Sequence, residues 1–128
     1  MAPFTILLVE DDVDVREALA DALGDKGYLV ECASDGEHAL HLLRTAARPG
    51  LILLDLMMPR MNGTEFRMAQ REDPALADLP VVLLSADARI EEMARALKVQ
   101  GAVRKPIDLD QLCGLIERIR GAVSKTSA

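Results

Sequence analysis

Short runs of aliphatic residues, each bounded by polar or turn-forming residues, recur along this chain and predict buried strands. The clearest lie in Thr5–Val9, Leu51–Asp55 and Val81–Ser85, which each contain four consecutive aliphatic residues. Such runs, without alternating polar positions, are typical of strands in the interior of a parallel sheet. Residues 29–33 and the shorter segment 102–104 are two further expected strands, which gives five in all.

Apolar positions at helical spacing occupy the segments between these strands. We expect helices over about 13–26 and 89–99, from the turn at 34–37, after Asn62-Gly63, and from Asp108 onward. This alternation of strands and helices predicts an α/β fold, a doubly wound parallel sheet with helices on both faces. In the first helix, the residues expected on the inward face are Val15, Ala18, Leu19, Ala22 and Leu23.

The length of 128 residues fits one domain over residues 1–123, followed by a short polar tail at 124–128. Half of the residues are hydrophobic, but only two are Phe, one is Tyr and none is Trp, so the core must be aliphatic. A net charge of -6 and a pI near 4.9 argue against a nucleic-acid-binding or anionic-membrane surface.

Two cysteines, Cys32 and Cys113, fall on predicted apolar faces and form no disulfide or zinc-binding pattern. They indicate reduced core thiols, as expected in a cytoplasmic protein. The sequence begins without a secretory signal and contains no apolar stretch of membrane-spanning length, which supports the same location.

Charged and hydroxyl residues follow the strongest strands. Glu10, Asp11 and Asp12 come after the first strand, Asp55 ends the third, and Ser85 ends the fourth. Because the carboxyl ends of parallel strands meet at one edge of a sheet, we expect these groups to converge there. Clustered carboxylates repel one another unless a cation lies among them. The sequence therefore predicts a magnesium site centred on Asp55.

Four motifs in this order, Glu10-Asp11, Asp55–Gly63, Ser85-Ala86 and Lys105-Pro106, resemble the receiver domain of two-component response regulators. The resemblance covers about residues 4–123. It implies a five-stranded, flavodoxin-like sheet of order 2-1-3-4-5 between two helical layers, a three-layer α/β/α arrangement. It also implies a signalling role for the acidic edge.

The resemblance identifies Asp55 as the phosphoacceptor. It implies that Asp11 and Asp55 ligate Mg²⁺ directly, that Glu10 holds a metal-bound water, and that the backbone carbonyl of Met57 completes the protein ligands. The family usually has Asp at the position of Glu10. Asp12 has an alternative interpretation as the N-cap of the helix that begins at residue 13.

The resemblance also assigns roles to three residues beyond the metal ligands. Lys105 is implied to bring its ammonium group to the phosphoryl oxygens. Pro106 matches a proline that follows a cis peptide bond in the family. The Ser85 hydroxyl is implied to donate to a phosphoryl oxygen after Asp55 is modified. A surface lysine and a serine bonded to a strand-end backbone group are the plainer alternatives.

One position departs from the family pattern. Ala102 stands three residues before Lys105, where receivers usually carry the Tyr or Phe that acts as a switch. We therefore expect either a weak conformational response or a phosphate-relay role that needs little response. Met57 and Asp87 occupy positions that tune dephosphorylation in the family. Because Met57 is apolar, we expect slow-to-moderate self-dephosphorylation.

The leading functional prediction is a phosphoacceptor module of a two-component phosphorelay, and not an enzyme. Its expected partners are a sensor histidine kinase or a histidine phosphotransfer protein and a downstream protein of unknown identity, without direct nucleic-acid or membrane binding. Nothing in the sequence resembles an output domain, so a stand-alone or excised receiver is expected. The candidate kinase-docking residues are Val13, Asp14, Val15 and Ile107.

Three other functions use similar folds. A Mg²⁺-dependent phosphatase resembling the haloacid-dehalogenase family needs a second Asp two residues after the nucleophile, where Met57 stands. A flavin-binding electron carrier is disfavoured because the acidic loop after the first strand would repel the flavin phosphate. A phosphorylation-independent adaptor remains the alternative because of Ala102. The helix residues His38 and His41 are read as exposed and not as a metal pair.

Overall fold

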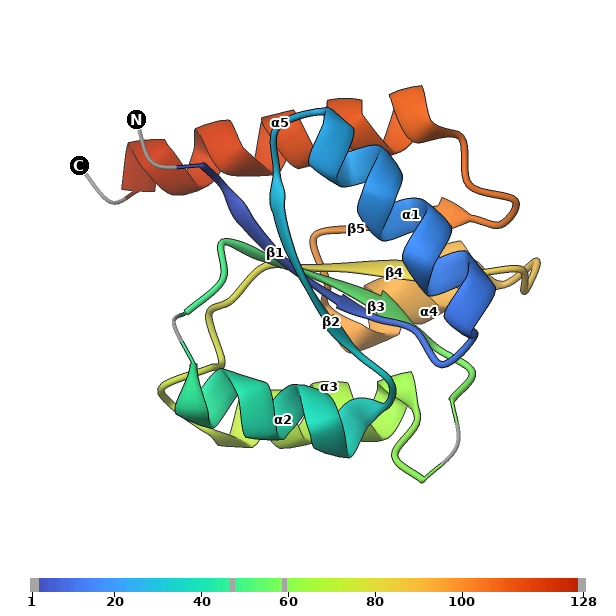
Figure 1. The fold of residues 1–128 in the computed structure, drawn as a ribbon. Helices are drawn as coiled ribbons and strands as arrows, with labels where there is room; N and C mark the ends of the chain where they lie inside the picture. Colours follow the sequence, from blue (N-terminus) through green and yellow to red (C-terminus); the bar gives the residue numbers. More distant parts are fainter. Residues whose placement is uncertain (1–2, 47, 59, 127–128) are drawn as a thin grey trace.

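The computed structural model describes residues 3–46, 48–58 and 60–126 of the chain. Five parallel strands form one sheet of order β2-β1-β3-β4-β5, and five helices connect and follow them (Figure 1). This confirms the predicted doubly wound topology. The elements are β1 (Thr5–Val9), α1 (Val13–Asp25), β2 (Leu29–Ala33), α2 (Gly36–Thr45), β3 (Leu51–Asp55), α3 (Gly63–Glu72), β4 (Val81–Ser85), α4 (Ile90–Leu97), β5 (Gly101–Arg104) and α5 (Leu109–Thr126).

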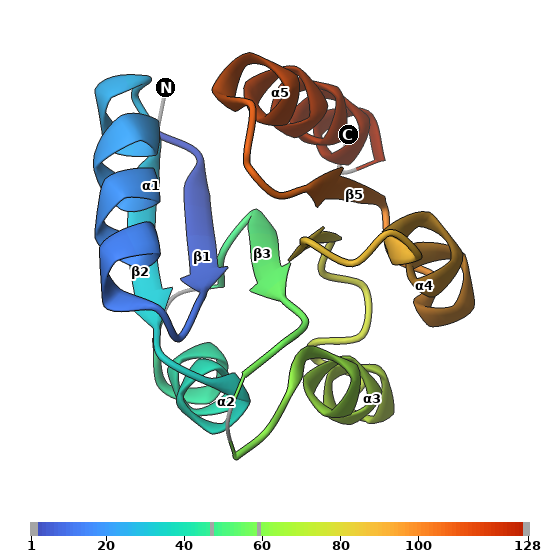
Figure 2. The ribbon, with the colours of Figure 1, turned by 90° about the vertical axis from the view of Figure 1, so that its right-hand side faces the viewer.

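The three central strands divide their side chains between two aliphatic cores. Leu8 and Leu53 belong to the core under α1 and α5, whereas Leu7 and Leu54 belong to the core under α2, α3 and α4. Figure 2 shows these helical layers on opposite faces of the sheet. Because successive strand residues point to opposite faces, an uninterrupted aliphatic run is what a sheet covered on both sides requires.

The helix starts follow from their capping residues. Asp12 accepts a hydrogen bond from the Val15 backbone N–H at 3.1 Å, which confirms its interpretation as the N-cap of α1. Asn62 and Glu65 form a reciprocal capping box at the start of α3. α5 continues through residues 124–126, which the sequence assigned to the polar tail, and residues 127–128 lie outside the described part of the chain.

The apolar face expected of α1 is only partly in the core. Leu19 and Leu23 are buried, but Val15 and Ala18 are exposed. The sequence pattern predicts one apolar face for α1, but the sheet covers only the part of that face that contains Leu19 and Leu23. Val15 and Ala18 instead line a surface groove beside the acidic edge.

The start of α3 lies close to the end of β3. A Cβ atom added at Gly63 would lie 2.8 Å from the Asp55 carbonyl oxygen and 2.8 Å from the Leu56 Cα atom. The Gly63 backbone N–H donates to the Leu56 carbonyl at 3.1 Å. A glycine is therefore required here to fold the loop after Asp55 back against its own strand.

None of the helices in the described ranges combines the length and the apolar composition that crossing a membrane demands.

The residue that caps the C-terminal end of α4 has an unfavourable backbone conformation. Lys98 has a φ of 55°, in the left-handed region that glycine adopts without strain. We expect Lys98→Gly to raise the free energy of unfolding by about 0.5–1 kcal/mol because it removes this strain. Urea unfolding measures the change.

A matched glycine substitution inside the same helix is the control. Ala96 is exposed in α4, so Ala96→Gly should lower the free energy of unfolding by about 1 kcal/mol. If both variants were destabilised alike, the left-handed cap would not be the reason.

Candidate functional site

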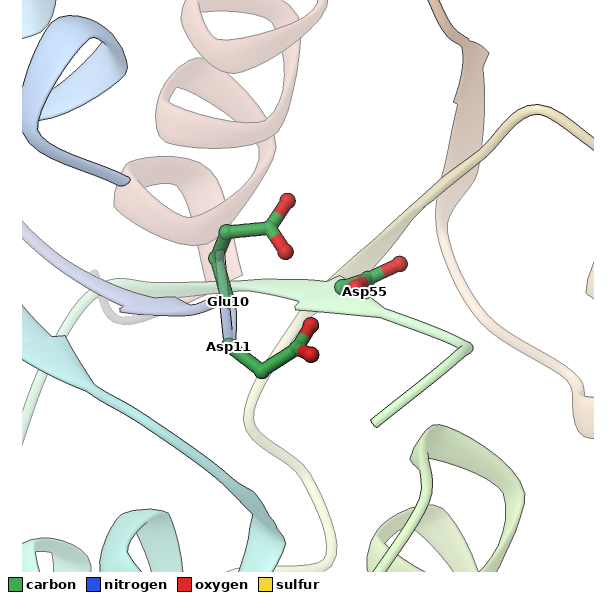
Figure 3. Close-up of side chains that lie close together, drawn as sticks. All are labelled: Glu10, Asp11 and Asp55. Carbon is green, nitrogen blue, oxygen red and sulfur yellow. The ribbon is translucent and has the colours of Figure 1, made fainter. Parts of the chain in front are cut away.

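Three carboxylates converge at the carboxyl edge of the sheet. Glu10, Asp11 and Asp55 each offer a carboxylate oxygen, and these atoms lie within 4.8 Å of one another (Figure 3). Glu10 and Asp55 are buried, with 1% and 4% of their surfaces exposed, whereas Asp11 is exposed. Asp12 is not part of the group, because its side chain caps α1. Three of the four acids expected at this edge therefore form the pocket.

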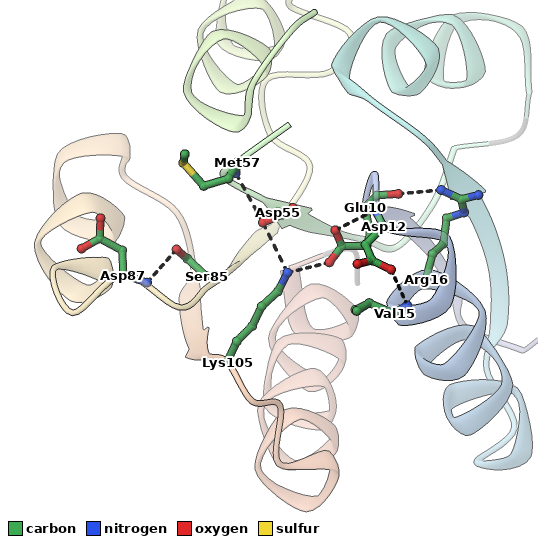
Figure 4. A network of polar contacts seen from close by, with 9 residues as sticks. All are labelled: Glu10, Asp12, Val15, Arg16, Asp55, Met57, Ser85, Asp87 and Lys105. Carbon is green, nitrogen blue, oxygen red and sulfur yellow. Dashed lines mark hydrogen bonds and ion pairs between the residues drawn. The ribbon is translucent and has the colours of Figure 1, made fainter. Parts of the chain in front are cut away.

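A lysine from the end of β5 reaches into this pocket (Figure 4). The Lys105 Nζ atom lies 2.7 Å from Glu10 Oε1 and 3.6 Å from Asp55 Oδ1. The Lys105 backbone N–H donates to the Ser85 carbonyl at 2.8 Å, and the Lys105–Pro106 peptide bond is cis. The ammonium group thus partly neutralises two buried carboxylates, and its shorter contact is with Glu10.

The pKa values of the two buried carboxyl groups, Glu10 and Asp55, are shifted in opposite directions. Burial, followed by the adjacent Glu10 carboxylate, raises the pKa of Asp55 to about 7. Burial acts to raise the pKa of Glu10 as well, but the hydrogen bond and charge of Lys105, together with hydrogen bonds from Asp55 and the Asp12 backbone, outweigh it, so the pKa of Glu10 is lowered. The closer ammonium contact of Glu10 explains why Asp55 is the group that holds a proton.

Hydroxyl and backbone groups surround Asp55. The Met57 backbone N–H lies 3.3 Å from Asp55 Oδ1, and the Met57 side chain is 75% exposed. The Ser85 hydroxyl oxygen accepts from the Asp87 backbone N–H at 3.1 Å. The Asp87 carboxylate is engaged by the Arg89 guanidinium, with Nη2 and Oδ2 3.1 Å apart. Ser85 therefore links the acidic edge to the segment that leads into α4.

Three further residues lie where the sequence placed them in the fold. Ala102 is half-buried in β5 and pairs with Leu83 of β4. His38 and His41 are exposed on α2, and His38 Nδ1 accepts from the Ser34 backbone N–H at 3.2 Å. In the part of the chain that the structure describes, neither histidine belongs to a cluster of three potential metal ligands.

Sequence reasoning did not identify Arg16 as part of this edge. Its guanidinium donates to the Glu10 backbone carbonyl at 2.8 Å, which ties the first turn of α1 to the acidic loop. An arginine in the first turn of a helix carries no motif that distinguishes it from a solvated side chain, so only the folded geometry reveals the contact.

The donor set of the pocket fits a hard divalent cation. Carboxylate oxygens are the ligands that Mg²⁺ prefers, and the exposed Asp11 leaves one side of the group facing solvent. The raised pKa of Asp55 agrees with this, since a buried carboxyl beside a second carboxylate keeps its proton until a cation is bound. The arrangement is typical of the acidic triad that forms the Mg²⁺ site of receiver domains.

The fold and the acidic pocket together define a receiver-like α/β domain. The model of the response regulator receiver domain matches residues 6–117, so the chain belongs to this family of two-component signalling proteins. Domains of this family are phosphoacceptor modules and not classical enzymes, and they are phosphorylated by histidine kinases.

Individual relatives agree with this assignment. The response regulator MprA of Mycolicibacterium vanbaalenii is 38% identical over 98% of this chain and 52% of its own length. The regulatory protein AtoC of Escherichia coli is 36% identical over 88% of this chain and 24% of its own length. The chain thus spans about half the length of the MprA proteins that it matches.

Solved structures show the same fold. The chemotaxis protein CheY4 of Vibrio cholerae superposes with a TM-score of 0.83 at 30% identity, over 92% of this chain and 99% of that one. A response regulator receiver protein from Pseudomonas putida gives a TM-score of 0.84 at 30% identity, over 92% and 98% of the two chains.

The crowded carboxylates predict a pH-dependent cost of keeping Asp55 charged. The folded chain holds the Asp55 proton up to a pH of about 7, whereas the unfolded chain releases it near the ordinary aspartate pKa of 3.8. Between these values the folded state binds more protons, so this group's contribution to stability falls as the pH rises. Without metal, Asp55→Asn should therefore raise the free energy of unfolding by about 1–2 kcal/mol near pH 8.

Urea unfolding in the presence of a chelator, repeated from about pH 8 down to about pH 5, tests this. The gain should shrink toward the acidic end, where wild-type Asp55 is protonated as well. Asp12→Asn is the control, because asparagine caps a helix as well as aspartate does and Asp12 lies outside the pocket. An equal gain in both variants, or a gain that does not change with pH, would contradict the interpretation.

Proposed function

We propose that Asp55 accepts a phosphoryl group from a histidine of a kinase or phosphotransfer protein. The observation that carries this proposal is the meeting of Glu10, Asp11 and Asp55 with the Lys105 ammonium at one sheet edge. A buried carboxylate with an ammonium group beside it is the arrangement that supports transfer of a phosphoryl group onto a side-chain oxygen.

In the proposed reaction, one carboxylate oxygen of Asp55 attacks the phosphorus atom of the phosphohistidine. A P–O bond forms as the P–N bond breaks, and the electron pair of that bond stays on the imidazole nitrogen, which takes a proton from water. The product is an acyl phosphate on Asp55. Because the transferring group carries negative charge throughout, the Lys105 ammonium supports the reaction by pairing with its oxygens.

Glu10, Asp11, Asp55 and the Met57 carbonyl are the proposed ligands of Mg²⁺, with Glu10 acting through a water molecule. The bound ion would supply positive charge against the phosphoryl oxygens. Lys105 and the ion compete for the same carboxylates, so we infer that Lys105 loosens from Glu10 when the ion enters. The 2.7 Å contact between the Lys105 Nζ atom and Glu10 Oε1 is the contact that the ion would weaken.

Ser85 and Asp87 are proposed to carry the consequences of phosphorylation. The Ser85 hydroxyl accepts from Asp87, so its own proton is free to donate to a phosphoryl oxygen. Asp87 is held by Arg89 and Met57 is apolar, so neither is well suited to orient an attacking water. We therefore propose that the acyl phosphate is lost slowly. Pro106 is proposed to aim Lys105 inward.

A groove beside Lys105 supports docking of a histidine-bearing partner. Its cavity has a volume of about 600 Å³, and its walls come from α1, from Ala86 after β4 and from the segment after β5. Val13 and Val15 are exposed apolar residues at the start of α1, close in the chain to the acidic loop. The predicted docking residues Val15 and Ile107 both line this groove. An apolar surface next to the acceptor suits the helices of a kinase or phosphotransfer protein.

The domain is proposed to act in the cytoplasm, without direct contact to nucleic acid or membrane, and to pass its state to a downstream protein. Ala102 favours a weak conformational response or a relay role, and it is the one observation that favours a phosphorylation-independent adaptor as the alternative.

Incubation with a small acyl phosphate and Mg²⁺, followed by intact mass spectrometry, tests the acceptor. Wild-type protein should gain one phosphoryl group, and Asp55→Asn should gain none because its amide oxygen is a poor nucleophile. Asp12→Asn, which keeps the helix cap, should be phosphorylated like the wild type. A phosphoryl gain in Asp55→Asn would refute the assignment, and loss of the adduct within seconds would contradict slow hydrolysis.

The groove is tested by comparing a protein donor with the small donor. Ala18 is exposed in the groove, so Ala18→Arg should fill it and slow phosphoryl transfer from an autophosphorylated histidine kinase about tenfold or more. Phosphorylation by the acyl phosphate should be unchanged. Ala96→Arg, an equivalent change on the exposed face of α4, is the control. Equal transfer rates in both variants would exclude the groove as the docking site.

A further inference from the structure

A buried arginine in α3 holds the end of α4. Arg67 is only 4% exposed. Its Nε atom donates to the Leu97 carbonyl at 3.0 Å, and its Nη2 atom donates to the Lys98 carbonyl at 2.7 Å. These carbonyls belong to the last turn of α4, where backbone oxygens have no partner within the helix. The guanidinium therefore acts as a C-terminal cap supplied by another helix.

The guanidinium is itself fixed from the side. Its Nη1 atom donates to Gln70 Oε1 at 2.8 Å, and Gln70 is fully buried. The Gln70 amide nitrogen in turn donates to the carbonyls of Leu76 and Leu79 at 2.9 and 3.1 Å. The connection between α3 and β4 thus supports Arg67 through Gln70. Because the Arg67 guanidinium and the Gln70 amide are both held by hydrogen bonds, we expect the guanidinium to keep its position if α4 moves.

Burying this charge is costly and is not offset by an ion pair. Burial, followed by the nearby Arg71, lowers the pKa of Arg67, and among the described residues no carboxylate lies within ion-pair distance of it. A buried charge of this kind is weak support for stability compared with an aliphatic side chain of similar size. A role in fixing geometry accounts better for a buried charged residue whose neighbours supply hydrogen-bond acceptors and no opposite charge.

The other end of α4 is held differently. Its N-cap residue, Arg89, makes no capping hydrogen bond with its side chain. Asp87 fixes the segment before it through two hydrogen bonds. The Asp87 backbone N–H donates to the Ser85 hydroxyl, and the Asp87 carboxylate accepts from the Arg89 backbone N–H at 2.8 Å. The beginning of α4 is therefore linked to the acidic edge, whereas its end is linked to α3.

We propose that Arg67 is a fixed anchor that confines the response to phosphorylation to the Ser85 end of α4. The proposal rests on phosphorylation at Asp55. A change at the Ser85 hydroxyl passes through Asp87 into the first turn of α4, while the guanidinium keeps Leu97 and Lys98 in place. The absence of an aromatic side chain at Ala102 leaves this route as the one that the geometry provides.

The anchor is tested first in the unphosphorylated protein, by amide hydrogen exchange measured residue by residue. The Lys98 and Val99 backbone N–H groups close the end of α4 on Arg95 and Ala94. Arg67→Met should speed their exchange tenfold or more relative to amides of β1 and β3. Arg71→Met, which removes an exposed arginine one turn along α3, is the matched control and should leave them unchanged.

Arg67→Lys guards against a variant that does not fold. It keeps the charge but loses the two-pronged donor, so exchange at Lys98 and Val99 should lie between wild type and Arg67→Met, or be clearly faster than wild type if Arg67→Met is unfolded. Unchanged exchange in Arg67→Lys and Arg67→Met alike, or equal acceleration in Arg71→Met, would overturn the anchor.

The confinement is tested by adding Mg²⁺ and beryllofluoride, a phosphoryl mimic, and mapping changes in amide chemical shifts. In wild type, shifts should be large over 85–91 and small over 96–100. In Arg67→Lys they should spread into 96–100. Wild-type shifts of equal size at both ends would overturn the proposal. No shifts at all near Asp55 and Met57 would count against the proposed phosphorylation, and the exchange experiment would still decide on the anchor.

Discussion

The repulsion between buried carboxylates at one edge of the sheet is the constraint on which the rest of this structure depends. Glu10 and Asp55 can be held together only because the Lys105 ammonium pairs with both and because Asp55 retains a proton. The surrounding architecture serves this placement. β1 and β3 lie side by side, so the first two acids and Asp55 end at one level, and β5 delivers the lysine from across β4. A site that is unfavourable by itself is thereby made ready for a divalent cation.

Much of the fold could be predicted because hydrophobic periodicity and strand-end chemistry agree. The aliphatic runs of β1, β3 and β4 indicate strands covered on both faces, and the helical segments between them require parallel connections. The pattern was less reliable for α1, where Val15 and Ala18 are as apolar as a core face but lie in a groove. Periodicity reports which side of a helix avoids water, and it does not report whether the sheet or a partner covers that side.

The candidate site was predictable as a set of residues and not as a geometry. Strand-end positions place Glu10, Asp11 and Asp55 at one edge, but only the folded structure shows that Lys105 lies closer to Glu10, at 2.7 Å, than to Asp55, at 3.6 Å. The contacts of Arg16 and Arg67 were missed for another reason. Each binds backbone carbonyls, and because every residue has one, the sequence does not indicate which carbonyl a side chain will bind.

The alanine at position 102 has a consequence for how other proteins could read this domain. A small methyl group in β5 offers no ring that could turn inward or outward, so a change of surface at β5 upon modification would have to come from other side chains. In a switch that works through residues 85–90, any reader must touch the rim of the acidic edge itself. The groove proposed for the phosphoryl donor also contains Ala86, so such a reader and the donor would compete for this part of the surface and would bind the domain in turn.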